Sequence, residues 1–174
     1  MNKFIALDLE TTGLDFDKDQ IIEIALAKFE NGEVSQTLSK VIKPQQKVRE
    51  FIVKLTGISR DELSQGQDVE SIMPEVIAFI GDLPIVAHNA NFDKHFFHKT
   101  CDALSIDKPN NIFLDTLWIS RLAWHHAPNH KLETLVQFLN LPQTGFHRAL
   151  PDAIHCGQIF LPVSYTHLTL PTTD

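Results

Sequence analysis

The sequence predicts an α/β fold in which helices cover a mixed β-sheet, and three observations support this class. The segment Lys3–Leu9 alternates between two faces, as a strand does. Two β-branched runs, Gln20–Phe29 and Val34–Ile42, flank the dipeptide Asn31-Gly32. From residue 45 onwards, helical periodicity alternates with short apolar runs. A small antiparallel meander followed by helices and short strands is typical of such a sheet.

The first three strands are predicted from alternation and from turn chemistry. In Lys3–Leu9, three side chains (Phe4, Ala6 and Asp8) point to one face of the strand, and three (Ile5, Leu7 and Leu9) point to the other. Asn31-Gly32 predicts a tight hairpin, because both central residues of a type I′ turn need a positive φ. Pro44 ends the third strand, since proline cannot donate to the ladder.

The remaining elements are expected to be helices separated by two short buried strands, Ile85–Ala87 and Ile112–Leu114. The expected helices share apolar residues spaced three or four apart: Val48–Leu55, Val69–Ile80, Asn91–Leu104, Thr116–Trp124, Lys131–Leu139 and Pro151–Leu161.

Local signals mark several helix ends. Gly57 is expected to close the first helix, and Ser59 with Glu62 forms a capping box that opens another turn. Pro74 is compatible with its helix only if it lies in the first turn, where its missing N–H has no partner to lose. Pro151 biases Leu150 towards an extended conformation, so we expect it to delay the start of the last helix.

Composition excludes several classes of protein. The 174 residues are 43% apolar and 21% charged, with a net charge of −7, which favours one globular domain and argues against a broad basic surface for nucleic acid. The two cysteines, Cys101 and Cys156, are too few and too far apart for a disulfide scaffold or a zinc ribbon. We find neither a signal peptide nor an apolar run long enough to span a membrane, so a cytoplasmic location is expected.

Residues 1–161 contain no internal repeat or linker and are expected to form one domain. Residues 162–174 resemble a translated sequencing adapter, so we expect a non-native tail that truncates the natural domain near Leu161. An ordinary C-terminal extension is the alternative interpretation.

Three segments that contain acidic residues are candidates for a catalytic or metal-binding site. The first, Asp8-Leu9-Glu10, places two carboxylates on one face of a strand, about 6.6 Å apart by strand rise. Buried together they would repel each other, but they suit a hard divalent cation that prefers oxygen ligands. The other interpretation is a polar strand end that leads into a loop.

The second segment is His88-Asn89-Ala90-Asn91-Phe92-Asp93, and the third runs from His147 to Asp152. Both place an acid near a helix start, where the helix dipole favours an anion, so each aspartate could also be an ordinary capping residue. The occurrence of all three segments in one small domain favours a shared site.

Together these segments resemble the three motifs of the DEDDh 3′–5′ exonuclease family (DnaQ-like and ribonuclease T-like), over residues 3–161. This family includes the proofreading subunit of the bacterial replicative polymerase, so DNA replication and repair are expected roles. The resemblance implies a ribonuclease H-like fold with a mixed five-stranded sheet flanked by helices. Thr11-Thr12 is more similar to the proofreading and helicase-fused branches than to the oligoribonucleases.

The resemblance also implies a role for each site residue. Asp8, Glu10, Asp93 and Asp152 would bind two divalent cations, Mg²⁺ or Mn²⁺, with Asp8 bridging them. His147 would be the general base that takes a proton from the attacking water. Four carboxylates would balance the charge of two such ions. The expected reaction removes nucleoside 5′-monophosphates from the 3′ end of single-stranded DNA or RNA.

Further residues are expected to contact substrate, again by resemblance: Thr11, Thr12, Gly13, Leu14, Ile58, His88, Asn89 and Phe92. Ordinary packing is the alternative for Leu14 and Phe92, and a helix C-cap at Gly57 is compatible with a role for the Thr56-Gly57-Ile58 loop. Arg148 is among the cations placed to meet the phosphate backbone. Two alternatives stay open for the whole chain: an inert nucleic-acid-binding module, and the exonuclease segment of a larger helicase or polymerase.

Overall fold

The computed structural model describes residues 1–143 and 147–166. In chain order its elements are β1 (Lys3–Thr11), β2 (Ile21–Glu30), β3 (Glu33–Val41), α1 (Glu50–Thr56), α2 (Arg60–Gln65), α3 (Val69–Ile80), β4 (Ile85–Ala87), α4 (Ala90–Ala103), β5 (Phe113–Asp115), α5 (Thr116–Ala123), α6 (Leu132–Phe138) and α7 (Ala149–Thr166).

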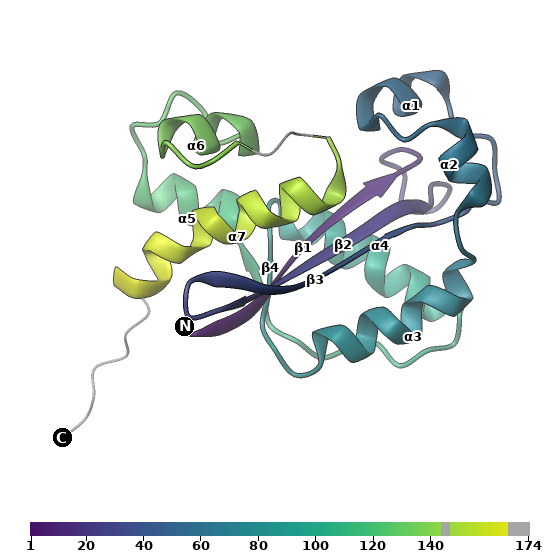
Figure 1. Ribbon diagram of the computed structural model, residues 1–174, viewed down its shortest axis with the longest axis horizontal. Coiled ribbons are helices and arrows are strands. Elements are labelled where there is room, and N and C mark those ends of the chain that lie inside the picture. The colour runs from purple at the N-terminus through teal and green to yellow at the C-terminus, as the bar shows by residue number, and fades with distance from the viewer. Residues whose placement is uncertain (144–146, 167–174) are drawn as a thin grey trace.

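The five strands form one mixed sheet in the order β3-β2-β1-β4-β5 (Figure 1). β1 pairs antiparallel with β2, and β2 with β3, whereas β4 runs parallel to both β1 and β5. This arrangement confirms the expected mixed five-stranded sheet and places β1 at its centre.

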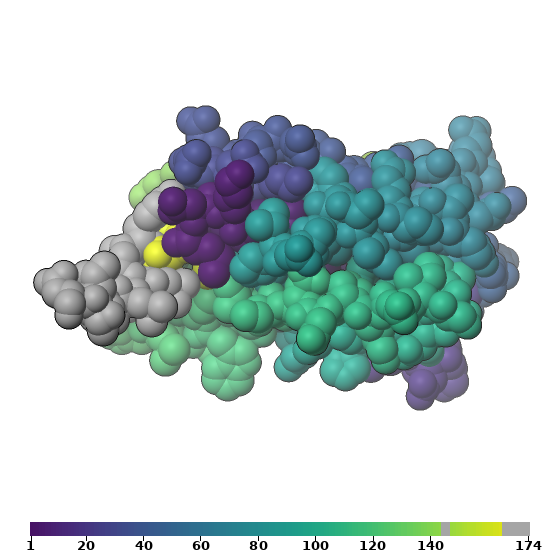
Figure 2. Space-filling model, turned by 90° about the horizontal axis from the view of Figure 1, so that it is seen from below, coloured from purple at the N-terminus to yellow at the C-terminus, as the bar shows by residue number. Residues whose placement is uncertain are grey.

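Helices cover both faces of the sheet, and β1 divides its side chains between them. Ile5, Leu7 and Leu9 pack in a core with α3 and α4, while Phe4 and Ala6 pack against α7. The alternation expected along β1 is therefore confirmed. In Figure 1, α7 crosses one side of the sheet and α3 lies on the other, and Figure 2 shows the N-terminal residues beside segments from the middle of the chain.

Several local signals are confirmed. Asn31 and Gly32 have φ angles of 53° and 89°, as a type I′ hairpin requires. Gly57 caps α1 in the left-handed conformation with φ 68°. Ser59 and Glu62 form both hydrogen bonds of the capping box at the start of α2.

The structure differs from the expectations for Pro74 and Pro151. Pro74 lies in the second turn of α3, not the first. The carbonyl that loses its partner belongs to Glu70, which is exposed, so water can satisfy it. Pro151 does not delay α7, because the helix already begins at Ala149 and the proline occupies its first turn, where no N–H is needed.

The last helix also crosses the expected domain boundary. α7 continues past Leu161 to Thr166 with Pro162 inside it, and the Ser164 hydroxyl donates to the Leu161 carbonyl (2.8 Å). Residues 167–174 of the expected tail lie outside the described residues. The boundary at residue 161 therefore stays a prediction.

Within the described ranges, no helix combines the length and apolar character that a membrane span needs. Cys101 and Cys156 are buried free thiols.

Candidate active site

Three of the expected metal ligands meet on one face of the sheet. Asp8 and Glu10 come from the central strand β1, and Asp152 from the first turn of α7, which packs across that face. One oxygen from each carboxylate lies within 4.8 Å of the other two. Residues distant in sequence thus form a cluster of hard oxygen ligands suited to a divalent cation.

Burial and mutual repulsion raise the pKa values of acids in the cluster. Burial raises the pKa of Asp8 well above its ordinary value, and the charges of Asp93 and Asp152 raise it further. Burial, followed by repulsion from Asp152 and Glu23, raises the pKa of Glu10 from 4.5 to about 7, although Arg148 opposes this shift. A bound cation would remove this repulsion.

Asp152 presents one oxygen that suits a metal. Its Oδ2 accepts the backbone N–H of His147 (3.1 Å). Its Oδ1 is buried and accepts no hydrogen bond among the described residues, with Nδ1 of His155 3.8 Å away. A buried carboxylate oxygen without a hydrogen bond is costly, so the donor set fits a divalent cation here.

Asp93 lies beside this cluster, although it is not one of the three carboxylates that converge within 4.8 Å. It is buried in the first turn of α4. Burial raises its pKa, against the effect of hydrogen bonds from its own backbone N–H and that of Leu9. Because Asp93 also raises the pKa of Asp8, the two charges face each other closely enough to interact.

His147 stands at the entrance to α7 with a half-exposed side chain. Its Nε2 lies 3.1 Å from Oε1 of Glu133 on α6, and its φ is 64°. The backbone of His147 therefore contacts the acid cluster through Asp152, while its ring is turned towards α6.

A cleft of about 720 Å³ opens beside Glu10. Leu14, Phe51 and Leu55 line it and are 79%, 70% and 41% exposed. Phe92 completes the apolar lining. Exposed apolar groups grouped at one cleft indicate a binding surface, and their size suits stacking against nucleic-acid bases.

Sequence reasoning included Leu14 and Phe92 but missed Phe51 and Leu55. These two are four residues apart on α1, which is also the spacing of a buried helix face. Their exposure depends on how α1 packs, so the sequence carried no signal that separated the cleft from the core.

Several hydrogen bonds fix the shape of the loop after β1. The Thr11 hydroxyl donates to the Gly13 carbonyl (2.6 Å), and the Thr12 hydroxyl donates to Asp19 (2.9 Å). Arg49 donates to the Thr12 carbonyl (3.0 Å). A Cβ on Gly13 would lie 2.3 Å from the side-chain ends of both Asp19 and Arg49, so a larger residue would have to displace these two side chains. Thr11 and Thr12 shape this loop, and Gly13 lines the cleft.

Ile58 packs in the core. Its side chain is fully buried among Ile22, Ile52 and Leu63 and does not line the cleft. A contact between the Thr56-Gly57-Ile58 loop and a nucleotide stays a prediction.

His88 and Asn89 follow β4 and face the next strand and helix. The two ring nitrogens of His88 lie 2.9 Å from the Thr116 hydroxyl and 3.0 Å from the His130 carbonyl, and burial lowers its pKa. The backbone N–H of Asn89 donates to Asp115 (2.9 Å). Both residues thus have structural partners, and their contact with substrate stays a prediction.

The raised pKa of Glu10 predicts that the metal-free protein loses stability as pH rises. The unfolded chain releases this proton near 4.5, whereas the folded protein holds it to about 7. Between these values unfolding releases a proton, so the free energy of unfolding falls, by at most about 3 kcal/mol, and then levels off. Urea unfolding in chelator at about pH 5 and about pH 8 measures the fall. Glu10→Gln should show a smaller one; an equal fall in the variant would contradict the assignment to Glu10.

Comparisons with known proteins agree with the geometry. Residues 5–160 match a family model of the RNase T type, described as exonuclease. The PolC-type DNA polymerase III of Caldanaerobacter subterraneus subsp. tengcongensis is 36% identical over 159 residues, which are 91% of this chain and 11% of that protein. The counterpart from Thermotoga maritima is 35% identical over 161 residues, which are 91% of this chain and 12% of that protein. The chain thus spans about a tenth of the length of these relatives.

Solved structures share the fold. A zinc-bound complex of E. coli exonuclease I with single-stranded DNA has a TM-score of 0.83 at 18% identity, covering 97% of this chain and 42% of that one. Exonuclease X in complex with 5′-overhanging duplex DNA has a TM-score of 0.76 at 20% identity, covering 98% of this chain and 95% of that one. At these identities the likeness concerns the fold alone.

Proposed function

Because the chain belongs to the RNase T-type exonuclease family, we propose that it is a metal-dependent 3′–5′ exonuclease that releases nucleoside 5′-monophosphates. The observation that carries the proposal is the convergence of Asp8, Glu10 and Asp152 within 4.8 Å. A cleft of nucleotide size opens directly beside them. Single-stranded DNA is the proposed substrate, because a PolC-type DNA polymerase III and a complex with single-stranded DNA are among the matches.

We propose Mg²⁺ or Mn²⁺ as the natural ions. The donors are all carboxylates, which suit hard cations, and the Oδ1 of Asp152, which accepts no hydrogen bond from the described residues, supports such a ligand set. Asp8, Glu10 and Asp152 would hold one ion, and Asp8 with Asp93 a second. When bound, such ions supply positive charge that activates water and stabilises the attacking and leaving oxygens.

In this proposal the chain's own residues orient the substrate and move one proton. Leu14 and Phe92 hold the terminal bases, and the loop at Gly13 admits the sugar close to the backbone. His147 accepts the proton from the attacking water at an imidazole nitrogen. Its ring must turn from Glu133 towards Asp152 to do so, which the half-exposed position of the side chain permits.

The match to polymerase sequences supports a role within a larger assembly. The chain aligns with one segment of PolC-type polymerases. We propose that it acts beside a polymerase, fused or separate, and removes mispaired 3′ ends during replication or repair.

A digestion assay tests the direction and the product. A single-stranded DNA oligonucleotide labelled at its 5′ end should shorten stepwise with Mg²⁺ and release only 5′-monophosphates. Chelator should stop the reaction. Binding of the oligonucleotide without any shortening would favour the inert module instead, and preferential digestion of the matched RNA would correct the substrate.

A further inference from the structure

Glu23 is a buried acid that the proposed reaction does not use. It lies on β2 opposite Glu10 in the β1–β2 register, and its side chain is only 2% exposed. Residues opposite each other on antiparallel strands project to the same face. Glu23 is therefore a further carboxylate beside the acid cluster, and a buried carboxylate needs partners.

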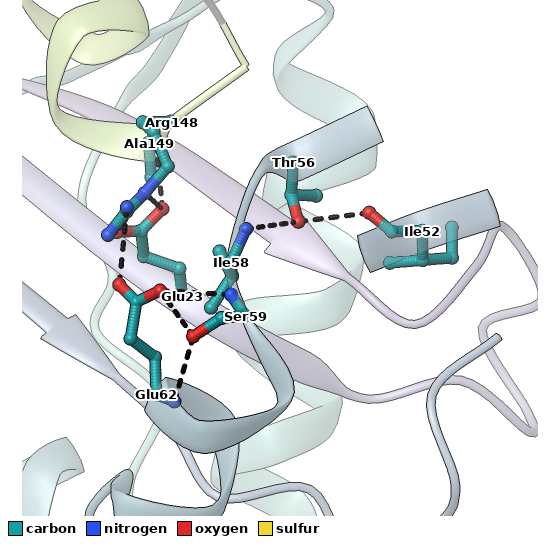
Figure 3. A network of polar contacts seen from close by, with 8 residues as sticks. All are labelled: Glu23, Ile52, Thr56, Ile58, Ser59, Glu62, Arg148 and Ala149. Carbon is teal, nitrogen blue, oxygen red and sulfur yellow. Dashed lines mark hydrogen bonds and ion pairs between the residues drawn. The ribbon is translucent and has the colours of Figure 1, made fainter. Parts of the chain in front are cut away.

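Both oxygens of Glu23 are engaged by the start of α7 (Figure 3). Oε1 accepts from Nη2 (2.9 Å) and Nε (3.2 Å) of Arg148. Oε2 accepts from Nε of Arg148 (3.3 Å) and from the backbone N–H of Ala149 (2.9 Å). Ala149 is the first residue of α7, so its N–H has no partner within the helix. Glu23 thus anchors this helix end to the sheet and has no oxygen left for a metal.

The anchored residue connects two site residues. Arg148 follows His147 directly, and its carbonyl accepts the backbone N–H of Asp152 (3.2 Å). The backbone N–H of His147 in turn donates to Oδ2 of Asp152. Arg148, held against β2, thus lies within the backbone segment that hydrogen-bonds both the backbone N–H and Oδ2 of Asp152, whereas Oδ1 faces the cluster.

The same guanidinium also contacts α2. Nη1 of Arg148 lies 3.4 Å from Oε1 of Glu62, whose Oε2 accepts from the backbone N–H (2.9 Å) and hydroxyl (2.8 Å) of Ser59 (Figure 3). This contact is longer and more exposed than that with Glu23, so the main effect of Arg148 should pass through Glu23.

We propose that Glu23 and Arg148 are a positioning pair that orients Asp152 and His147 for metal binding and proton transfer. The proposal rests on the proposed function, and it gives Arg148 a role other than the expected contact with the phosphate backbone. A guanidinium can form two parallel hydrogen bonds with one carboxylate, so such a pair fixes the orientation of both side chains as well as balancing their charges.

The decisive variant is Glu23→Met/Arg148→Met, which replaces the pair with apolar side chains and leaves no unpaired buried charge. We measure Mn²⁺ affinity, kcat and KM on the full chain. Mn²⁺ affinity and kcat should each fall by at least about tenfold, with KM within about twofold. The matched control is Lys40→Met/Glu75→Met, which removes an ion pair of 2.9 Å between β3 and α3 and should change neither.

Wild-type Mn²⁺ affinity and kcat in the double Met variant, or a rise in KM alone, would overturn the proposal. If that variant fails to fold, Arg148→Lys is measured in its place, because lysine keeps the positive charge but cannot form the two parallel hydrogen bonds of a guanidinium. Mn²⁺ affinity is expected to fall, and a wild-type Mn²⁺ affinity in Arg148→Lys would contradict a positioning role. If the wild-type protein binds Mn²⁺ but digests no oligonucleotide, the proposed function fails. The Mn²⁺ affinities of the wild type and the double Met variant still test the positioning role of Glu23 and Arg148.

Discussion

Asp8→Asn is expected to lower the rate of nucleotide release by about three orders of magnitude. The substitution keeps the size of the side chain but removes the charge at the centre of the cluster, where Asp8 interacts with Asp93, Asp152 and Glu10. Binding of the oligonucleotide in the cleft should persist, because the apolar lining is untouched. Steady-state digestion of a single-stranded oligonucleotide measures the loss.

A matched control is Asp107→Asn, which makes the same change at an exposed position. It should retain wild-type activity. Without metal, Asp8→Asn should also be at least as stable as the wild type, because it removes a carboxylate whose charge is costly to bury. The same cost of burial raises the pKa of Asp8. Full activity of Asp8→Asn in a folded protein would refute the proposed metal site.

His147→Gln is expected to lower kcat by about two to four orders of magnitude while KM stays nearly constant. Glutamine can still form hydrogen bonds at this half-exposed position but cannot accept a proton near neutral pH. Steady-state digestion of a single-stranded oligonucleotide measures both parameters.

The control for this change is His125→Gln, an exposed histidine in the loop between α5 and α6. It should leave kcat and KM unchanged. If His147→Gln kept the wild-type kcat, another group would have to accept the proton, and the resemblance to the DEDDh family would not extend to its mechanism.

Much of the fold could be predicted because its signals are local. The alternation along β1, the Asn31-Gly32 turn and the capping box of Ser59 with Glu62 each depend on a few neighbouring residues, and each is confirmed. The positions of the prolines could not be predicted with the same success. Whether Pro74 is tolerated depends on the exposure of the Glu70 carbonyl, which tertiary packing decides.

In the site, too, local relations could be predicted from the sequence, whereas contacts that depend on tertiary packing could not. Asp8 and Glu10 could be paired because strand geometry relates them directly, and the motifs linked them to Asp152. The burial of Ile58 could not be predicted, because it depends on packing against β2. The pair of Glu23 and Arg148 joins residues 125 positions apart, so no local pattern indicates it. Acids and cations near a motif are visible in a sequence, but their partners are not.

Calorimetric titration of Mn²⁺ into the metal-free protein tests the central claim most directly, which is that carboxylates from β1, α4 and α7 jointly bind divalent cations. The wild-type protein should bind the ion with release of protons near neutral pH, since Glu10, whose pKa is raised to about 7, must ionise. Asp8→Asn should bind it far more weakly. Equal heats and stoichiometry for both proteins, or none for the wild type, would contradict the claim.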